Sequence, residues 1–293
     1  MNDLNLAIIG AGPAGLAAGI QLRKNGYNPV IFEECQLGGL IRNANCIDNY
    51  LGVKPGITGL EFTEMLKEHI NEFKLNIQYE RVSELDFIDG RFSLVTESGV
   101  KFFSHLFIAS GTKPCKLEKV KLINCDHEDL FSEIISIRNS VNGKVIIIGS
   151  GDIAFDYALS LSQSSYVIIL NRGFQIKANK MLQTKVFNNN RIQYKPNYEI
   201  KSIKYLGTEF IITGLANGSD LELRGNIVLA LIGRAPQKDF YSGNLIIIEQ
   251  RLIASGRLYL IGDVHKKSLR QVSIAAGSGV KAAMKFHISR AGE

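Results

Sequence analysis

The chain has 293 residues, of which 45% are hydrophobic and 21% charged. This is the composition of a globular protein, and the length predicts two domains. No apolar run approaches the ~20 residues that span a bilayer, and the first strand begins too early for a signal peptide, so we expect a cytoplasmic protein. The formal net charge of +6 is spread along the chain, whereas nucleic-acid binding favours a clustered basic patch. We therefore expect neither a membrane nor a nucleic acid as partner.

The cysteines are too few and too scattered for a disulfide scaffold or a zinc site. No two of them have the Cys-x-x-Cys spacing, since they stand at Cys35, Cys46, Cys115 and Cys125. We expect reduced thiols and no bound metal.

A glycine motif follows the first apolar run. Leu4–Ile9 predicts a buried strand, the string GAGPAG at residues 10–15 a tight turn, and the small and apolar residues after it a helix. This order is typical of a dinucleotide-binding fold. Gly10 permits the turn, Gly12 lets backbone N–H groups reach a diphosphate, and Gly15 lets the helix pack closely on the sheet. The alternative is a glycine-rich turn of some other α/β protein.

An acidic residue ends the second strand. Pro29–Phe32 runs into Glu33, where a carboxylate accepts hydrogen bonds from both hydroxyls of an adenosine ribose and disfavours a 2′-phosphate. The loop after it carries the paired Gly38 and Gly39, and later Asn49. Because loops at the carboxyl ends of strands line the ligand crevice, we expect this loop to contact the same nucleotide.

The next segments complete a first domain. A helix is expected over Gly59–Leu75, followed by three short antiparallel strands at residues 85–88, 92–96 and 100–103. Leu106–Ile108 returns to the sheet, and the stretch from Ala109 to Pro114 then leaves it. We place the first crossing between domains there.

A second unit of the same kind begins at the strand Lys144–Ile148. It continues with Gly149-Ser150-Gly151-Asp152-Ile153-Ala154 and a helix, and a further strand, Tyr166–Leu170, leads to Asn171 and Arg172. Two such units predict two nucleotides. An arginine in place of an acid at the second strand end favours a 2′-phosphate. Alternating strands over 191–232 precede a return crossing at Gly233–Pro236.

With these elements assembled, the chain resembles the thioredoxin-reductase-like branch of the two-dinucleotide flavoproteins over almost its whole length. The most specific match is near the end, where Gly262-Asp263-Val264, Arg270-Gln271 and a helix of small residues look like the family's ribityl motif and the helix that points at the isoalloxazine. Gly38-Gly39 and Asn49-Tyr50-Leu51-Gly52 look like its flavin loop. The resemblance implies an α/β protein with two Rossmann-like domains of three-layer ββα architecture.

The same resemblance assigns domains and sites. It implies an FAD-binding domain of residues 1–111 and 238–293, with an NAD(P)-binding domain of residues 112–237 inserted into it. The expected FAD site consists of Gly10, Gly12, Pro13, Ala14, Gly15, Glu33, Glu34, Gly38, Gly39, Leu40, Asn49, Ala109, Gly111, Gly262, Asp263, Arg270, Gln271 and Val272. The expected site for NADPH, or NADH, consists of Gly149, Gly151, Asp152, Ile153, Arg172 and Lys177.

Two departures from the family pattern bear on function. The family's Cys-x-x-Cys-Asp should precede the second glycine motif, and the nearest string here has Leu122 at the first cysteine, followed by Cys125 and Asp126. A dithiol relay needs a second sulfur to resolve a mixed disulfide, so it is excluded as written. The family's NADPH clamp, His-Arg-Arg with a further Arg, is reduced here to Arg172 and Lys177.

Three functions are therefore open. The first is a reductase in which electrons of NAD(P)H pass through the flavin directly to an acceptor such as ferredoxin or flavodoxin, as in thioredoxin-reductase-like ferredoxin–NADP reductases, or to a small molecule. The second is a thiol–disulfide reductase that uses one cysteine, either Cys125 with Asp126 as proton donor or Cys46. The third is a non-catalytic FAD-binding redox sensor. In each case the resemblance implies a homodimer.

Overall fold

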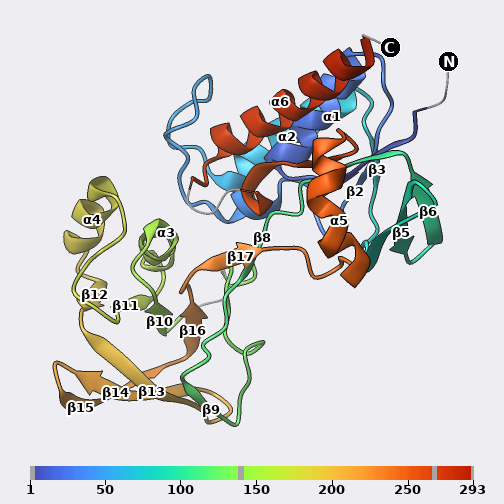
Figure 1. Ribbon diagram of the computed structural model, residues 1–293. Coiled ribbons are helices and arrows are strands. Elements are labelled where there is room, and N and C mark those ends of the chain that lie inside the picture. The colour runs from blue at the N-terminus through green and yellow to red at the C-terminus, as the bar shows by residue number, and fades with distance from the viewer. Residues whose placement is uncertain (1–3, 138–141, 266–268, 292–293) are drawn as a thin grey trace. The chain divides into compact units, whose positions relative to one another are not determined.

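The computed structural model describes residues 4–137, 142–265 and 269–291 (Figure 1). Contacts divide the chain into a first unit of residues 1–42, 48–113 and 235–293 and a second unit of residues 43–47 and 114–234. The crossings between domains were expected at 111/112 and 237/238. The contact boundaries lie close to them, at 113/114 and 234/235. Asn43–Ile47 groups with the second unit because the Asn43 side chain accepts from the Ile135 N–H at 3.1 Å and donates to Glu133 at 3.2 Å.

A five-stranded parallel sheet forms the centre of the first unit. Its strands in spatial order are β18 (Leu258–Leu260), β7 (His105–Ile108), β1 (Leu6–Ile9), β2 (Val30–Phe32) and β3 (Asn76–Gln78). Side chains of a strand alternate between the two faces, so Leu6 and Ile8 enter one core while Ala7 and Ile9 enter another. The sheet is thus covered on both faces, as expected of a parallel sheet.

Helices cover the first face of this sheet. Figure 1 shows them together as α1 (Pro13–Lys24), α2 (Gly59–Glu72) and α6 (Val272–Ala291). The α2 helix begins with a capping box, because the Thr58 hydroxyl accepts from the Glu61 N–H and the Glu61 carboxylate accepts from the Thr58 N–H. Small residues bring α1 and α6 into close contact, since a Cβ at Gly279 would lie 2.1 Å from the Ala14 carbonyl oxygen.

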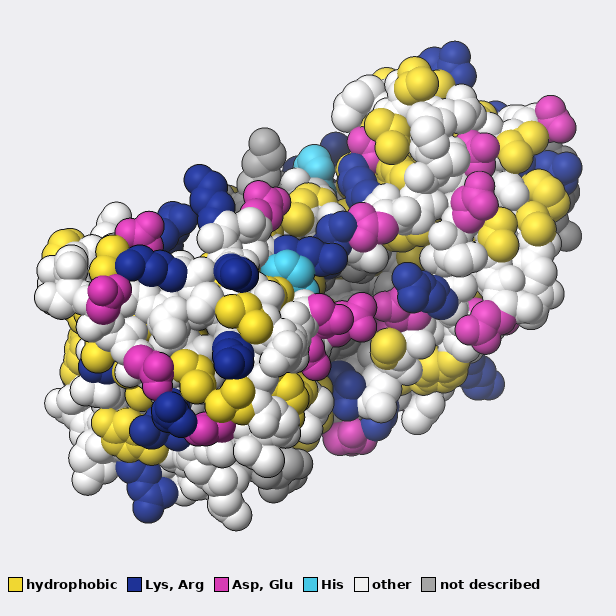
Figure 2. All heavy atoms as spheres, turned by 90° about the horizontal axis from the view of Figure 1, so that it is seen from below, with side chains coloured by type: hydrophobic (Ala, Val, Ile, Leu, Met, Phe, Trp, Pro, Cys, Tyr) yellow, Lys and Arg dark blue, Asp and Glu magenta, His cyan; other side chains and the backbone are white. Residues whose placement is uncertain are grey.

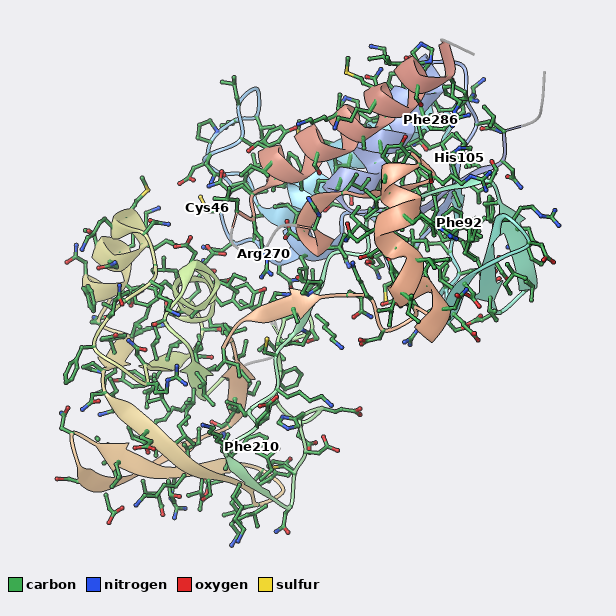
Figure 3. The ribbon with its side chains drawn as sticks, in the orientation of Figure 1. Cys46, Phe92, His105, Phe210, Arg270 and Phe286 are labelled. Carbon is green, nitrogen blue, oxygen red and sulfur yellow. The ribbon has the colours of Figure 1, made fainter. Side chains whose placement is uncertain are left out.

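The second face carries an antiparallel sheet and one helix. These are β4 (Glu84–Ile88), β5 (Arg91–Thr96), β6 (Gly99–Phe103) and α5 (Gly243–Ala254). The three expected strands are confirmed. Phe92 lies in the core on this face and Phe286 in the core under the helices, where its ring packs edge-on against His105 with centroids 5.1 Å apart (Figure 3).

The second unit repeats the three layers. Its parallel sheet has the order β12 (Ile192–Lys195), β11 (Tyr166–Leu170), β10 (Lys144–Ile148) and β16 (Ile227–Ala230). Helices α3 (Asp152–Leu161) and α4 (Lys180–Phe187) cover one face. A sheet of β15 (Ser219–Gly225), β14 (Phe210–Ala216), β13 (Tyr198–Tyr205) and β9 (Lys121–Ile123) covers the other. The expected α/β class with two Rossmann-like three-layer units is confirmed.

The remaining elements are short. They are the strand pair β8 (Thr112–Pro114) with β17 (Arg234–Pro236), and the 3₁₀ turns η1 (Gly39–Asn43) and η2 (Gly262–Val264). Within the described ranges, no helix is long and apolar enough to cross a membrane. Basic side chains on the face in Figure 2 are interspersed with acidic and apolar ones, which agrees with the even spread of charge along the sequence.

Candidate nucleotide sites

The first glycine loop is tightly packed at Gly10 and Gly15 and has open space at Gly12. Gly10 has φ +102°, and a Cβ there would lie 2.4 Å from the Ala109 carbonyl oxygen. A Cβ at Gly15 would lie 1.9 Å from the Gly10 oxygen. At Gly12, which caps α1, the nearest atom to a Cβ would be the Gly38 oxygen at 3.9 Å. Pro13 and the buried Ala14 then begin α1. This leaves room for an anion at the positive end of the helix.

Glu33 is fixed beside this loop. Its side chain is 9% exposed and follows β2, and its carboxylate accepts from the Ala11 N–H at 2.7 Å and from the Cys35 N–H at 3.0 Å. Each carboxylate oxygen has a second lone pair, so further donors such as ribose hydroxyls can bind. Glu34 is exposed instead and lies 3.6 Å from Arg81.

The paired glycines contact the same loop. The Gly38 N–H donates to the Ala11 oxygen at 2.9 Å. A Cβ at Gly39 would lie 3.5 Å from the Gly12 Cα atom. Leu40 follows half-buried in η1, whereas Asn49 stands exposed in the next loop.

The segments after β7 and β18 complete this edge of the sheet. The Ala109 N–H donates to the Ile9 oxygen at 2.8 Å, and Gly111 turns with φ +67°. Gly262, with φ +70°, would place a Cβ 2.7 Å from Ala14 Cβ, and Asp263 follows it half-buried. The expected residues after β1, β2, β7 and β18 therefore meet at the carboxyl edge of one sheet. Arg270 (Figure 3), Gln271 and Val272 lie at the start of α6.

The second glycine loop has the same form. Gly149 has φ +143°, and a Cβ there would lie 2.3 Å from the Leu231 oxygen, while Gly151 caps α3 with open space around it. Asp152 and Ile153 begin α3 with exposed side chains. Ala154, at the third position of the motif, is buried.

Arg172 and Lys177 lie in one loop that is tied to the second glycine loop. Both are exposed, and the N–H groups of Lys177 and Ala178 each donate to the Ser150 oxygen at 3.0 Å. The buried Asn171 shapes the start of the loop, because its amide donates to the Gln175 oxygen at 3.0 Å and to the Tyr194 hydroxyl at 2.8 Å. The roles of Ser150 and Asn171 were not predicted from the sequence, since neither the contacts to backbone groups nor the contact with Tyr194 leaves a spacing signal.

Cys125, the first candidate for a catalytic thiol, lies at the edge of the hydrophobic core of the second unit. Leu122 lies in β9 and packs with Cys125 against the core of the second unit. The Cys125 thiol donates to the Ile203 oxygen at 3.6 Å, while the exposed Asp126 accepts from the Glu128 N–H at 2.6 Å in a local turn. Cys46 (Figure 3) is half-buried.

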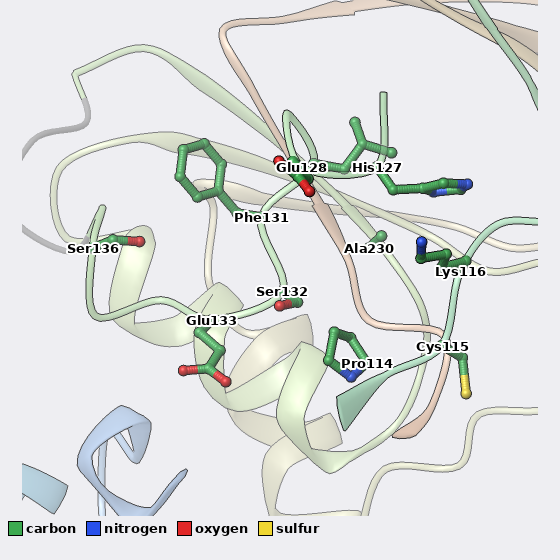
Figure 4. Close-up of a pocket in the computed structure, with 11 residues that line it drawn as sticks. Pro114, Cys115, Lys116, His127, Glu128, Phe131, Ser132, Glu133, Ser136 and Ala230 are labelled. Carbon is green, nitrogen blue, oxygen red and sulfur yellow. The ribbon is translucent and has the colours of Figure 1, made fainter. Parts of the chain in front are cut away.

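A pocket of about 420 Å³ lies in the second unit, beside the end of β16 (Figure 4). Its wall includes Cys115, a cysteine that was not among the catalytic candidates from the sequence. The lining residues are Pro114, Cys115, Lys116, His127, Glu128, Leu130, Phe131, Ser132, Glu133, Ser136 and Ala230.

Two glycine loops of this geometry, each on its own three-layer α/β unit, define the class of two-nucleotide oxidoreductases. The chain belongs to the pyridine nucleotide-disulphide oxidoreductase family, whose model matches residues 4–279. Its thioredoxin reductase-like members use FAD and NADPH, and the expected resemblance is confirmed.

Relatives named for different activities match almost the whole length of the chain. The chain is 26% identical to thioredoxin reductase of Peptoclostridium acidaminophilum, over 96% of this chain and 95% of the relative. It is 25% identical to glucosaminate ammonia-lyase of Pseudomonas fluorescens, over 94% and 92%. The solved thioredoxin reductase of T. acidophilum superposes with a TM-score of 0.84 at 22% identity, over 99% and 100%.

Proposed function

We propose that the chain is an FAD-dependent NAD(P)H oxidoreductase whose electrons leave directly to an acceptor, without a redox dithiol. The observation that carries this proposal is the position of Leu122 and Cys125. Where a dithiol would be expected, the chain has a short strand whose Leu122 packs into a core and a thiol bonded to a backbone carbonyl. With no resolving sulfur, a thiol relay has no second step.

The glycine loop and Glu33 of the first unit fit the diphosphate and the ribose of FAD. The glycine loop has no side chain where a diphosphate would approach the α1 N-terminus, and the buried Glu33 carboxylate stands where a ribose would bind. When bound there, FAD would supply hydride-transfer chemistry, which amino-acid side chains do not provide. We assign the binding to Gly10, Gly12, Pro13, Ala14, Gly15, Glu33, Gly38, Gly39, Leu40, Asn49, Ala109, Gly111, Gly262, Asp263, Arg270, Gln271 and Val272.

The second unit would hold the nicotinamide nucleotide. Gly149 and Gly151 leave the α3 N-terminus open for a diphosphate. Arg172 and Lys177 would bind a 2′-phosphate, the arginine through two parallel N–H donors and the lysine as a point charge. NADPH is therefore the proposed donor over NADH.

Anaerobic titration tests this proposal. The purified yellow protein should bleach on addition of NADPH, and less readily with NADH. It should then reduce a small dye or quinone at a rate that survives replacement of all four cysteines by serine. A flavin that neither nicotinamide reduces would contradict the proposal and favour the redox sensor.

A second candidate function is a reductase with one catalytic cysteine. The observation in its favour is that Cys115 lines the pocket of the second unit together with His127 and Lys116. A catalytic thiol has to be accessible to its substrate, and a partly exposed position in the wall of a pocket meets that requirement. If Cys115→Ser abolished turnover while the flavin remained reducible by NADPH, this function would replace the first.

The acceptor and the assembly also belong to the proposal. We propose a small redox protein or a small molecule as acceptor, and a homodimer as the assembly. An isologous contact would need an exposed apolar surface, and α2 offers Leu60 and Met65, each 41% exposed. A light-scattering mass near the 32.4 kDa of one chain would contradict the dimer.

A further inference from the structure

The loop that carries Arg172 and Lys177 is held at its far end by the second glycine loop. We call residues 172–179 the clamp loop. Two of its N–H groups, from Lys177 and Ala178, donate to the Ser150 oxygen at 3.0 Å. At its last residue, the Asn179 N–H donates to Asp152 Oδ1 at 2.7 Å, and the Asn179 side-chain amide donates to the same oxygen at 3.2 Å. Four hydrogen bonds thus join the two loops.

Asp152 and Asn179 each belong to a helix N-terminus. Asp152 is in the first turn of α3, directly after Gly151. Asn179 caps α4, because its side-chain oxygen accepts from the Leu182 N–H at 3.0 Å. The Asp152 carboxylate is therefore held by donors from the residue that caps α4, where the positive end of a helix favours a negative charge.

We infer that Asp152 and Asn179 form a latch that positions the clamp loop relative to the second glycine loop and thereby sets the preference for a 2′-phosphate. This inference rests on the proposed nicotinamide site. The diphosphate and the 2′-phosphate of one nucleotide are joined through the adenosine, so a site that reads both must hold its two loops at a fixed separation. A loop that is ordered before binding does not lose conformational freedom when the ligand arrives.

The latch acts on one end of the clamp loop only. Its start is held independently by Asn171, whose amide donates to the Gln175 oxygen and the Tyr194 hydroxyl. Loss of Asp152 should therefore leave the loop folded but loosen the end that carries Lys177. The diphosphate, which would bind to the backbone of the glycine loop, should not be affected by that loosening.

Calorimetric titration of the flavin-loaded full chain separates these effects. ADP-ribose and its 2′-phosphate are the probes, because they share the diphosphate and differ only in the group that the clamp loop would read. Asp152→Ala should lower the ratio of the affinities for the 2′-phosphorylated probe and for ADP-ribose about three- to tenfold, the effect of one or two hydrogen bonds. Asp152→Asn removes the charge but keeps an acceptor for the Asn179 N–H, so it should retain the preference.

Further variants test whether the loss of preference arises in the clamp loop. In a Lys177→Ala background, Asp152→Ala should cause no additional loss of preference, because the end of the loop that the latch holds no longer carries a phosphate contact. Asp220→Ala serves as control for the loss of one carboxylate, since Asp220 pairs with Lys201 at 3.1 Å on the antiparallel sheet of the same unit. Asn179→Ser keeps the helix cap and should reduce the preference less than Asp152→Ala. If Asp152→Ala unfolds the second unit, Asn179→Ser still measures the latch.

The outcomes distinguish the inference from the proposed function beneath it. Equal changes for both probes in Asp152→Ala and Asp152→Asn would mean that Asp152 acts through its charge alone, and the latch would be wrong. The same conclusion would follow if Asp152→Ala left the preference unchanged while Arg172→Ala abolished it. If Arg172→Ala changed the affinity for neither probe, the assignment of the nicotinamide site itself would fail.

Discussion

Replacement of Gly12 by alanine should separate folding from flavin binding. Gly12 has φ −77° and ψ −179°, an extended conformation open to any residue. Among the residues that the structure describes, apart from the chain neighbours of Gly12, the atom nearest to a Cβ there is the Gly38 oxygen at 3.9 Å. The variant should therefore fold. Alanine is a poorer helix cap than glycine but restricts the unfolded chain more, and the two effects offset each other to within about 1 kcal/mol.

The effect on binding should be much larger. The added methyl group would occupy the space in front of the α1 N-terminus, where the diphosphate has to approach the backbone N–H groups. A hydrogen bond to a charged group contributes about 1.5–3 kcal/mol. Loss of one such bond should weaken FAD binding by about ten- to a hundredfold.

The assay compares thermal unfolding of the apoprotein with FAD titration followed by flavin fluorescence. Gly151→Ala is the matched control, because Gly151 caps α3 with equally open surroundings. That variant should bind FAD normally but NADPH poorly. Gly15→Ala should instead fail to fold, since its Cβ would lie 1.9 Å from the Gly10 oxygen. Normal FAD affinity in a folded Gly12→Ala variant would refute the placement of the diphosphate at this loop.

Three further predictions concern single groups. Arg172→Ala should raise KM for NADPH more than for NADH by about 1.5–3 kcal/mol, and steady-state rates with each cofactor would show whether the arginine reads the phosphate. Replacement of all four cysteines by serine should preserve dye reduction, with some loss of stability at Cys125, where a hydroxyl would be placed at the edge of a core. Hydrogen bonds from Thr96, Ser98 and Lys101 lower the pKa of Glu80 from 4.5 to about 2, so its contribution to stability is present above pH 4.5 and is lost as the pH falls toward 2. Glu80→Gln should therefore flatten the acid limb of a plot of unfolding midpoint against pH, and an unchanged limb would contradict that role.

The parts of the fold that could be predicted are those with strong patterns. The apolar runs of β10 and β11 alternate between two cores, which requires a covered parallel strand. No element was predicted over helix α5, whose sequence contains Ile246, Ile247 and Ile248, β-branched residues that favour strands. The structure shows why a helix forms there: the Ser242 hydroxyl caps it by accepting from the Leu245 N–H at 3.1 Å. A single serine before an isoleucine run is too weak a signal to outweigh that preference.

The candidate site could be predicted only where the backbone dictates it. Gly10, Gly15 and Gly149 are required because a Cβ would overlap a carbonyl oxygen, and such positions appear directly as glycines in the sequence. The latch of Asp152 and Asn179 depends on a side chain meeting a backbone group 27 residues away. Neither the residue types nor their spacing indicates such a contact. The sequence therefore predicted Arg172 and Lys177 as phosphate ligands but not the hydrogen bonds that position their loop.

The two units have the same backbone hydrogen bonds around their glycine loops but differ in one side chain that follows the second strand. In each, the glycine after the first strand donates to the end of the second strand, Gly10 to Phe32 at 2.8 Å and Gly149 to Leu170 at 2.9 Å. The residue after the second strand is Glu33 in the first unit and Asn171 in the second. The Glu33 N–H donates to the oxygen of Gln78 in β3 at 2.9 Å, and the Asn171 N–H donates to the oxygen of Lys195 in β12 at 3.0 Å. These two residues therefore occupy equivalent positions.

Their side chains use that position in opposite ways. The Glu33 carboxylate turns toward its glycine loop, where it accepts from the Ala11 N–H. The Asn171 amide turns toward its own loop and the Tyr194 hydroxyl. At this position the first proposed site carries a carboxylate, whereas the second carries a neutral amide with Arg172 exposed beside it. Because the surrounding backbone is the same, we propose that this position contributes, together with Arg172 and Lys177, to the choice of a 2′-hydroxyl in the first nucleotide and a 2′-phosphate in the second.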